Sequence, residues 1–66
     1  MTNTIELEVA IKRSGLTKTE IAEKLGISQM ALYKKINNKT EFKASEIVAL
    51  SSLLHIDNKE QIFFSA

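Results

Sequence analysis

Apolar residues recur along the chain at the three- and four-residue spacing of α-helices, and no segment shows the two-residue alternation of a strand. The pattern divides into helical segments at about residues 4–14, 17–25, 28–37, 44–54 and 58–63. No linker, repeat or low-complexity stretch separates these segments. The sequence therefore predicts an all-α fold, a compact bundle of five short helices in a single domain, residues 1–66.

Capping residues mark most boundaries of the predicted helices. The pairs with the spacing of a capping box are Asn3 and Glu6, Thr17 and Glu20, and Asp57 and Glu60. Ser28 is a good N-cap for the third helix, whereas Lys43 is a poor one for the fourth. Gly15 and Gly26 follow the first two helices, where glycine adopts the left-handed conformation at low cost.

The apolar faces of the helices define the expected core. The first and fourth helices have broad faces, made by Ile5, Leu7, Val9, Ala10 and Ile11, and by Ala44, Ile47, Val48, Leu50, Leu53 and Leu54. In the third helix, Leu32 and Ile36 face the core, and we expect Lys35 to extend its charged end outward from the same side. Phe63 and Phe64 have two interpretations, an exposed dimer surface or rings packed into the core.

Residues 17–37 form the most informative segment, two predicted helices joined by a tight turn at Gly26. In a helix-turn-helix of this spacing, the first helix braces the second in the major groove of DNA. On a helical wheel at about 100° per residue, the outer side of the second helix carries Gln29, Met30, Tyr33, Lys34 and Asn37. Glutamine can pair with adenine, lysine can reach guanine or phosphate, and methionine or tyrosine can contact a thymine methyl. The helix N-terminus near Ser28 adds an anion site.

Each of these side chains also has a simpler interpretation. Taken alone, Gln29 and Lys34 would be interpreted as ordinary solvated residues. Their position in a capped hairpin favours base contact for both. Met30 is equally a gap-filler or a protein contact, and Tyr33 equally covers its own helix. Lys39 is equally well interpreted as a phosphate contact or as an ordinary solvent-exposed residue.

Positive charge is concentrated in the second half of the hairpin and in the loop after it. Residues 27–43 carry a net charge of +3 and the rest of the chain −2, within a total of +1. A local basic patch suits a nucleic-acid partner, although a solvated lysine-rich loop explains the charge equally well.

The composition argues against several other classes of protein. The chain has no cysteine and one histidine, His55, so we expect no disulfide and no metal site, and we interpret His55 as a surface residue. No nucleophile–base motif or glycine-rich phosphate loop occurs, so we expect no enzymatic activity and no cofactor. No apolar run approaches the roughly 20 residues that span a bilayer, and no signal-peptide pattern opens the chain, so we expect a cytoplasmic protein.

The segment from Gly15 to Thr40 resembles the lambda/434 repressor and Cro-like helix-turn-helix family, also called the XRE family; it reads GLTKTEIAEKLGISQMALYKKINNKT. The later helices fit the five-helix layout of that family more loosely. The string E-F-x-x-S-E-I from Glu41 to Ile47, with the closing double phenylalanine, is most similar to small regulators from phages of Gram-positive bacteria.

The resemblance implies a role for each matching position in binding double-stranded DNA. Base edges would be contacted by Gln29, Met30 and Lys34, with Tyr33 at the margin toward the backbone. Phosphates would be approached by Thr17 and Lys18 on one side of the groove, and by Asn37, Asn38, Lys39 and Thr40 on the other. Some members pair an arginine with a glutamate where this chain has Ile11 and Ile36, which implies an apolar contact instead.

We therefore expect sequence-specific binding of operator DNA by a small Cro- or repressor-like transcriptional regulator, acting as a homodimer on a two-fold site. The alternative is an antirepressor-type module that keeps the fold and binds another regulator protein. The small net charge and the residues Met30 and Tyr33 keep this alternative open.

Overall fold

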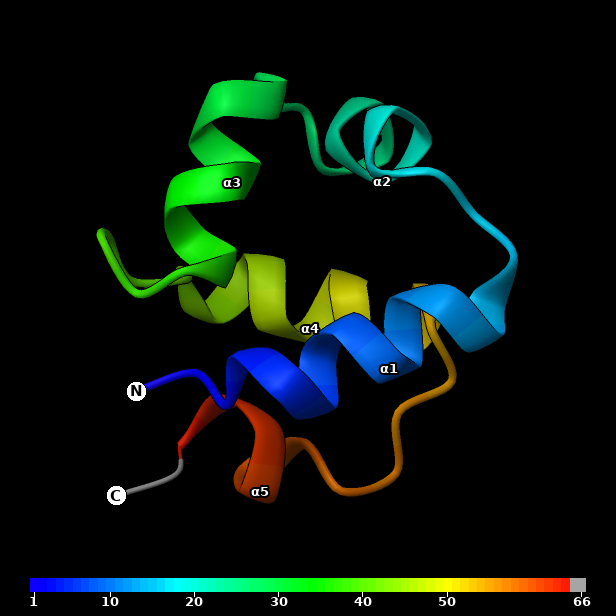
Figure 1. Cartoon of the computed structure of the whole chain (residues 1–66), viewed down its shortest axis with the longest axis vertical. Coiled ribbons are helices and arrows are strands. Elements are labelled where there is room, and N and C mark those ends of the chain that lie inside the picture. Colours follow the sequence, from blue (N-terminus) through cyan, green and yellow to red (C-terminus); the bar gives the residue numbers. More distant parts are fainter. Residues whose placement is uncertain (65–66) are drawn as a thin grey trace.

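The computed structural model describes residues 1–64, and this part of the chain forms five α-helices and no strand (Figure 1). The helices are α1 (Thr4–Ser14), α2 (Lys18–Leu25), α3 (Gln29–Ile36), α4 (Ala44–Leu53) and α5 (Lys59–Phe63). The all-α prediction is confirmed, and each helix lies within one or two residues of its predicted bounds.

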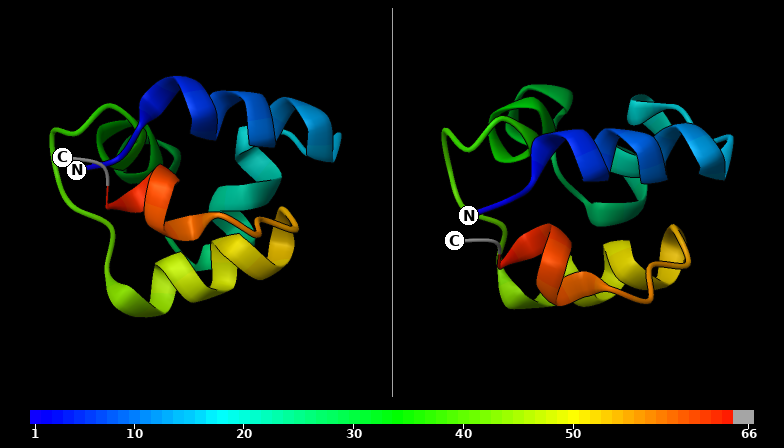
Figure 2. Two further views of the ribbon diagram at one scale, coloured as in Figure 1. Left: turned by 90° about the horizontal axis from the view of Figure 1, so that it is seen from below. Right: turned by 60° about the horizontal axis from the view of Figure 1, so that its bottom comes forward.

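The helices surround one core. α2 packs against α3 and α4, while α5 packs against α1 and α4. Viewed from below, α1, α5 and α4 lie toward the viewer, and α2 and α3 lie behind them (Figure 2). The largest fully buried side chains are Leu7, Ile21, Leu32, Ile36 and Leu50. Every helix from α1 to α4 thus contributes to the core, and α3 is held from its inner side.

Local capping signals set the starts of the first three helices. Thr17 and Glu20 form the complete capping box that their spacing predicts, with bonds of 3.1 Å and 2.9 Å. Asn3 makes half of its box, because its Oδ1 accepts from the Glu6 N–H at 3.1 Å. Gly26 is left-handed, with φ of 72°, and the next N–H closes onto Ala22 O at 3.0 Å. This closure makes the turn between α2 and α3 tight.

The apolar faces are narrower than the sequence indicates. In α1, Leu7 and Ile11 are buried, but Ile5 is 76% exposed and Val9 40% exposed. In α4, Ala44 and Val48 are exposed as well. A helix packed on one side buries one stripe, and these four residues lie outside it.

The C-terminal aromatic residues divide between the two interpretations. Ile62 and Phe63 are buried, and the Phe63 ring meets Phe42 edge-on with the ring centroids 5.4 Å apart. Phe64 is 62% exposed. One ring therefore belongs to the core, and the other is available at the surface.

The predicted capping box of Asp57 and Glu60 is wrong. α5 begins at Lys59, Asn58 occupies the N-cap without a side-chain bond to the backbone, and its Nδ2 donates to Gln61 Oε1 at 3.1 Å. The burial of Ile62 sets the register of this short helix and outweighs the cap signal.

The prediction for Lys35 is also wrong. Its Nζ donates to Glu46 Oε1 at 2.6 Å, with only 11% and 9% of the two side chains exposed. The same oxygen accepts from the Lys43 N–H at 2.8 Å, which supports the start of α4 although Lys43 offers no side-chain acceptor. Burial raises the pKa of Glu46, but the hydrogen bonds from Lys35 and the Lys43 backbone outweigh it and hold the pKa below 4.5. α3 and α4 are therefore joined by a buried ion pair.

Candidate nucleic-acid interface

The outer side of α3 is a row of exposed side chains on a helix whose inner side is closed. The five exposed residues are Gln29, Met30, Tyr33 and Lys34 of α3 and its C-cap residue Asn37. Met30 is 63% and Tyr33 55% exposed, whereas Leu32 and Ile36 on the inner side are each 1% exposed. The row thus combines amides, an ammonium group, a phenol and a thioether on a rigid support.

The N-terminal end of α3 retains the electrostatics expected of an anion site. Ser28 Oγ accepts from the Ala31 N–H at 3.0 Å, so the cap is formed as predicted. The first turn of a helix has more N–H groups than one cap can satisfy, and the helix dipole is positive there. No acidic side chain lies in this first turn.

The start of α2 is exposed, but its side chains already have partners. The Thr17 hydroxyl takes part in the capping box. The Thr17 backbone N–H donates to the Glu20 carboxylate, and this bond is the main cause that lowers the pKa of Glu20. Lys18 Nζ pairs with Glu8 at 3.0 Å, with the two side chains 50% and 41% exposed. An ion pair this exposed contributes at most about 1 kcal/mol, so a phosphate can compete for the ammonium group.

The turn after α3 is closed by backbone hydrogen bonds. Asn38 adopts a left-handed φ of 62°. The N–H groups of Lys39 and Thr40 both donate to Lys34 O, at 2.8 Å and 3.3 Å. Asn37 Nδ2 donates to Tyr33 O at 2.9 Å, and the side chains of Lys39 and Thr40 are exposed. This turn therefore presents two exposed polar side chains beside the C-terminal end of α3.

Asn38 differs from the other expected phosphate contacts. Its Oδ1 accepts from the Thr2 N–H and its Nδ2 donates to Thr2 O, both at 2.8 Å. The amide thus binds the N-terminal segment rather than facing solvent. Asn38 and Thr2 are 36 positions apart, so no local sequence pattern predicts this contact.

These elements occupy neighbouring parts of the molecule. Figure 1 shows α2 beside the upper part of α3, the turn after α3 at the lower end of that helix, and α5 at the bottom of the molecule. α3 exposes its row between the start of α2 and this turn in the order of the chain, as in a helix-turn-helix.

A model of the helix-turn-helix family matches residues 7–57. The chain belongs to this family. The resemblance to XRE-type, lambda repressor- and Cro-like proteins is thereby confirmed, and the family comprises DNA-binding transcription regulators. Comparisons with curated proteins and with solved structures gave no match.

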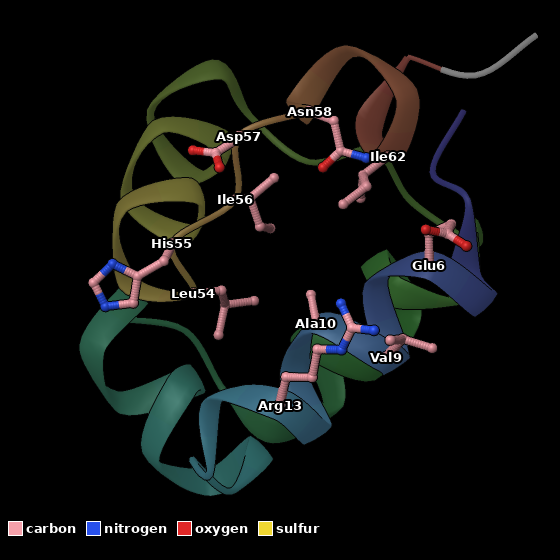
Figure 3. A pocket seen from close by; sticks show the side chains of 10 residues that line it. All are labelled: Glu6, Val9, Ala10, Arg13, Leu54, His55, Ile56, Asp57, Asn58 and Ile62. Atoms are coloured by element: carbon pink, nitrogen blue, oxygen red, sulfur yellow. The ribbon is translucent and has the colours of Figure 1, made fainter.

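Away from its α2–α3 hairpin, this helix-turn-helix protein has a surface pocket of about 240 Å³ (Figure 3). The pocket lies between α1 and the connection from α4 to α5, and Arg13, His55 and Asp57 are among its lining residues. None of the exposed residues of α3 lines it. Within residues 1–64, no group of three histidine, cysteine or acidic side chains is arranged to hold a metal ion. None of the described helices is long and apolar enough to cross a membrane.

Proposed function

We propose that this protein binds a specific double-stranded DNA sequence as a small Cro- or repressor-like transcriptional regulator, with α3 in the major groove. The observation that carries the proposal is the row of five exposed side chains on α3 and its C-cap residue, opposite a buried face that α2 braces. A recognition helix needs this division, because base contacts require free side chains on a fixed backbone.

The exposed residues divide by chemistry into two roles. Gln29 and Lys34 offer the donors and acceptors that distinguish base pairs, and Met30 and Tyr33 offer apolar contact to a thymine methyl. Phosphate contacts would come from Thr17, Lys18 and the Ser28 end of α3 on one side, and from Asn37, Lys39 and Thr40 on the other. Phosphate contacts fix position and base contacts fix sequence, so the two sets predict different mutant phenotypes.

We further propose that residues 1–66 act as one domain and bind as a homodimer on a two-fold operator, with half-sites roughly 34 Å apart. The exposed apolar residues Ile5, Val9 and Phe64 are candidates for the contact between copies. We also propose that the protein acts in the cytoplasm, where a bacterial cell keeps its DNA and that of its phages.

Selection from a random pool of DNA duplexes tests this function. An enriched motif with two-fold symmetry supports it, and affinity for that motif should fall steeply as salt concentration rises. A pool that stays random through repeated rounds at low salt would contradict specific DNA binding.

A second candidate function is an antirepressor-type module that binds another regulator protein. It is favoured by one observation: the two large exposed residues Met30 and Tyr33 lie together on α3. Such a module would show little DNA affinity at any salt concentration and would co-purify with a second regulator. Binding measured against DNA at several salt concentrations therefore separates the two candidates.

A further inference from the structure

The N-terminal segment before α1 is fastened to two distant parts of the fold. Thr2 is 6% exposed, although it is polar and lies beside the chain terminus. Its N–H and C=O both bond to the amide of Asn38, and the next residue, Asn3, donates its N–H to Ile62 O at 2.6 Å. Figure 2 shows this segment between the turn after α3 and α5.

A third attachment is made by the next residue, Thr4. Thr4 Oγ1 donates to Ile36 O at 2.7 Å, so the last carbonyl of α3 is bound by the start of α1. Residues 2–4 therefore contact both the end of α3 and the turn that follows it.

Asparagine is the side chain that meets both requirements at position 38. The backbone there is left-handed, with φ of 62°, a conformation that glycine and asparagine adopt most readily. The side chain must also accept from one backbone group of Thr2 and donate to the other. Glycine satisfies only the first requirement, and aspartate lacks the N–H donor.

The turn itself has little else to hold it. Lys39, Thr40 and Glu41 are all exposed, so packing contributes little to their order. The backbone bonds from Lys39 and Thr40 to Lys34 O are local. The Asn38 amide supplies two bonds of 2.8 Å to Thr2, 36 residues away in sequence, and a longer one of 3.5 Å to Thr4 Oγ1.

We propose that Asn38 is a positioning residue for DNA binding: its amide clamps the turn to Thr2 and thereby holds Lys39 and Thr40 where they contact phosphates. Asn38 does not contact DNA with its side chain. This inference rests on the proposed function, because the turn needs positioning only if it meets DNA.

The expected effect follows from counterion release. One phosphate contact on B-form DNA contributes about 0.9 to the slope of log affinity against log salt. At 0.15 M salt, losing one such contact lowers affinity roughly fivefold. Because phosphate contacts carry no sequence information, the loss should be the same for the selected motif and for unrelated DNA.

The test compares Asn38→Gly with His55→Gly. Asn38→Gly keeps a residue suited to positive φ and removes the amide bonds to Thr2 and Thr4. His55 also has a positive φ, 54°, and the N–H of the next residue, Ile56, donates to Ser51 O in α4. His55→Gly therefore introduces glycine into a similar left-handed turn that lies outside the proposed interface. Affinities for the motif and for random duplex are measured across a salt series. Hydrogen exchange of the Lys39 and Thr40 amides reports the order of the turn without DNA.

We expect Asn38→Gly to lose roughly fivefold in affinity for both duplexes, to reduce the salt slope by about 0.9, and to exchange the two amides faster. His55→Gly should bind and exchange at the turn like the parent. Parent-like binding and salt slope in Asn38→Gly would overturn the inference, as would a changed base preference.

Two further outcomes are also decisive. If the parent itself binds no DNA, the proposed function fails, and unchanged amide exchange in Asn38→Gly would show separately that no clamp exists. If Asn38→Gly does not fold, Thr4→Val keeps the side-chain shape but removes the bond to Ile36 O and the hydroxyl that accepts from Asn38 Nδ2 at 3.5 Å. A normal salt slope and normal amide exchange in that variant would count against a role of the N-terminal segment.

Discussion

The buried ion pair between Lys35 and Glu46 gives the most quantitative prediction. Replacing Lys35 with methionine leaves the Glu46 carboxylate buried, with 9% of its side chain exposed and only the Lys43 N–H at 2.8 Å as a partner. Removing one member of a buried pair costs about 3–5 kcal/mol, and the remaining hydrogen bond favours the lower end, near 3 kcal/mol. A 66-residue domain has roughly 3–10 kcal/mol of total stability, so this loss is large.

The assay is urea and thermal unfolding of three proteins: the parent, Lys35→Met, and the double variant Lys35→Met/Glu46→Leu. The single variant should lose about 3 kcal/mol, which lowers the melting temperature by roughly 12–24 °C. The double variant removes both charges and should recover most or all of that loss, because an apolar pair of similar volume avoids the desolvation cost.

The pH dependence supplies an independent check. In the parent, the folded-state pKa of Glu46 lies below its ordinary value, so its contribution is present above that value and is lost as pH falls through the lowered pKa. In Lys35→Met, the lysine no longer stabilises the carboxylate, so the pKa of Glu46 rises relative to the parent. The stability difference between the two proteins should therefore shrink as the pH falls through the raised pKa of Glu46 in the variant toward its lowered pKa in the parent. A single variant as stable as the parent at pH 7, or a gap that stays constant down to acid pH, would refute the reasoning.

Three further predictions concern the interface and the turns. Gln29→Ala and Lys34→Ala should each weaken binding to the selected DNA by about 1–3 kcal/mol in fluorescence anisotropy, with unchanged circular dichroism; parent-like binding by both variants would remove the recognition assignment. Gly26→Val should lower stability by about 1–3 kcal/mol through its φ of 72° alone, since no atom lies within 4 Å of an added Cβ; an unchanged melting temperature would contradict this. His55→Gly should raise stability by about 1 kcal/mol, because glycine relieves a left-handed φ of 54°; a lower melting temperature would show that the histidine ring stabilises the turn.

The parts of the fold that the sequence predicts well are those that local chemistry decides. The capping box of Thr17 and Glu20, the left-handed Gly26 and the cap at Ser28 all involve residues within four positions of one another. Their energies depend little on the rest of the molecule, so the bounds of α2 and α3 follow from the sequence.

The features that the sequence does not predict depend on partners far along the chain. Lys35 meets Glu46 across two helices, and the periodic pattern alone indicates only that Lys35 lies on the inner side. Asn38 binds Thr2, which is 36 positions away, although an asparagine just after a helix suggests a solvent-exposed turn. Both polar groups find buried partners that only the assembled fold supplies.

These long-range contacts also bear on how α3 can act. Lys34 and Lys35 are adjacent, so their side chains point about 100° apart around the helix. Because the Lys35 ammonium group is held by Glu46 and the Ile36 carbonyl by Thr4, rotation of α3 about its axis would break one buried and one partly buried hydrogen bond. The direction of Lys34 is thereby tied to the bonds that hold the neighbouring residues Lys35 and Ile36. Base preference in such an arrangement depends on the exposed side chains and stability on the inner ones, so substitutions at Gln29 or Lys34 should change the DNA sequence that is bound without changing the fold.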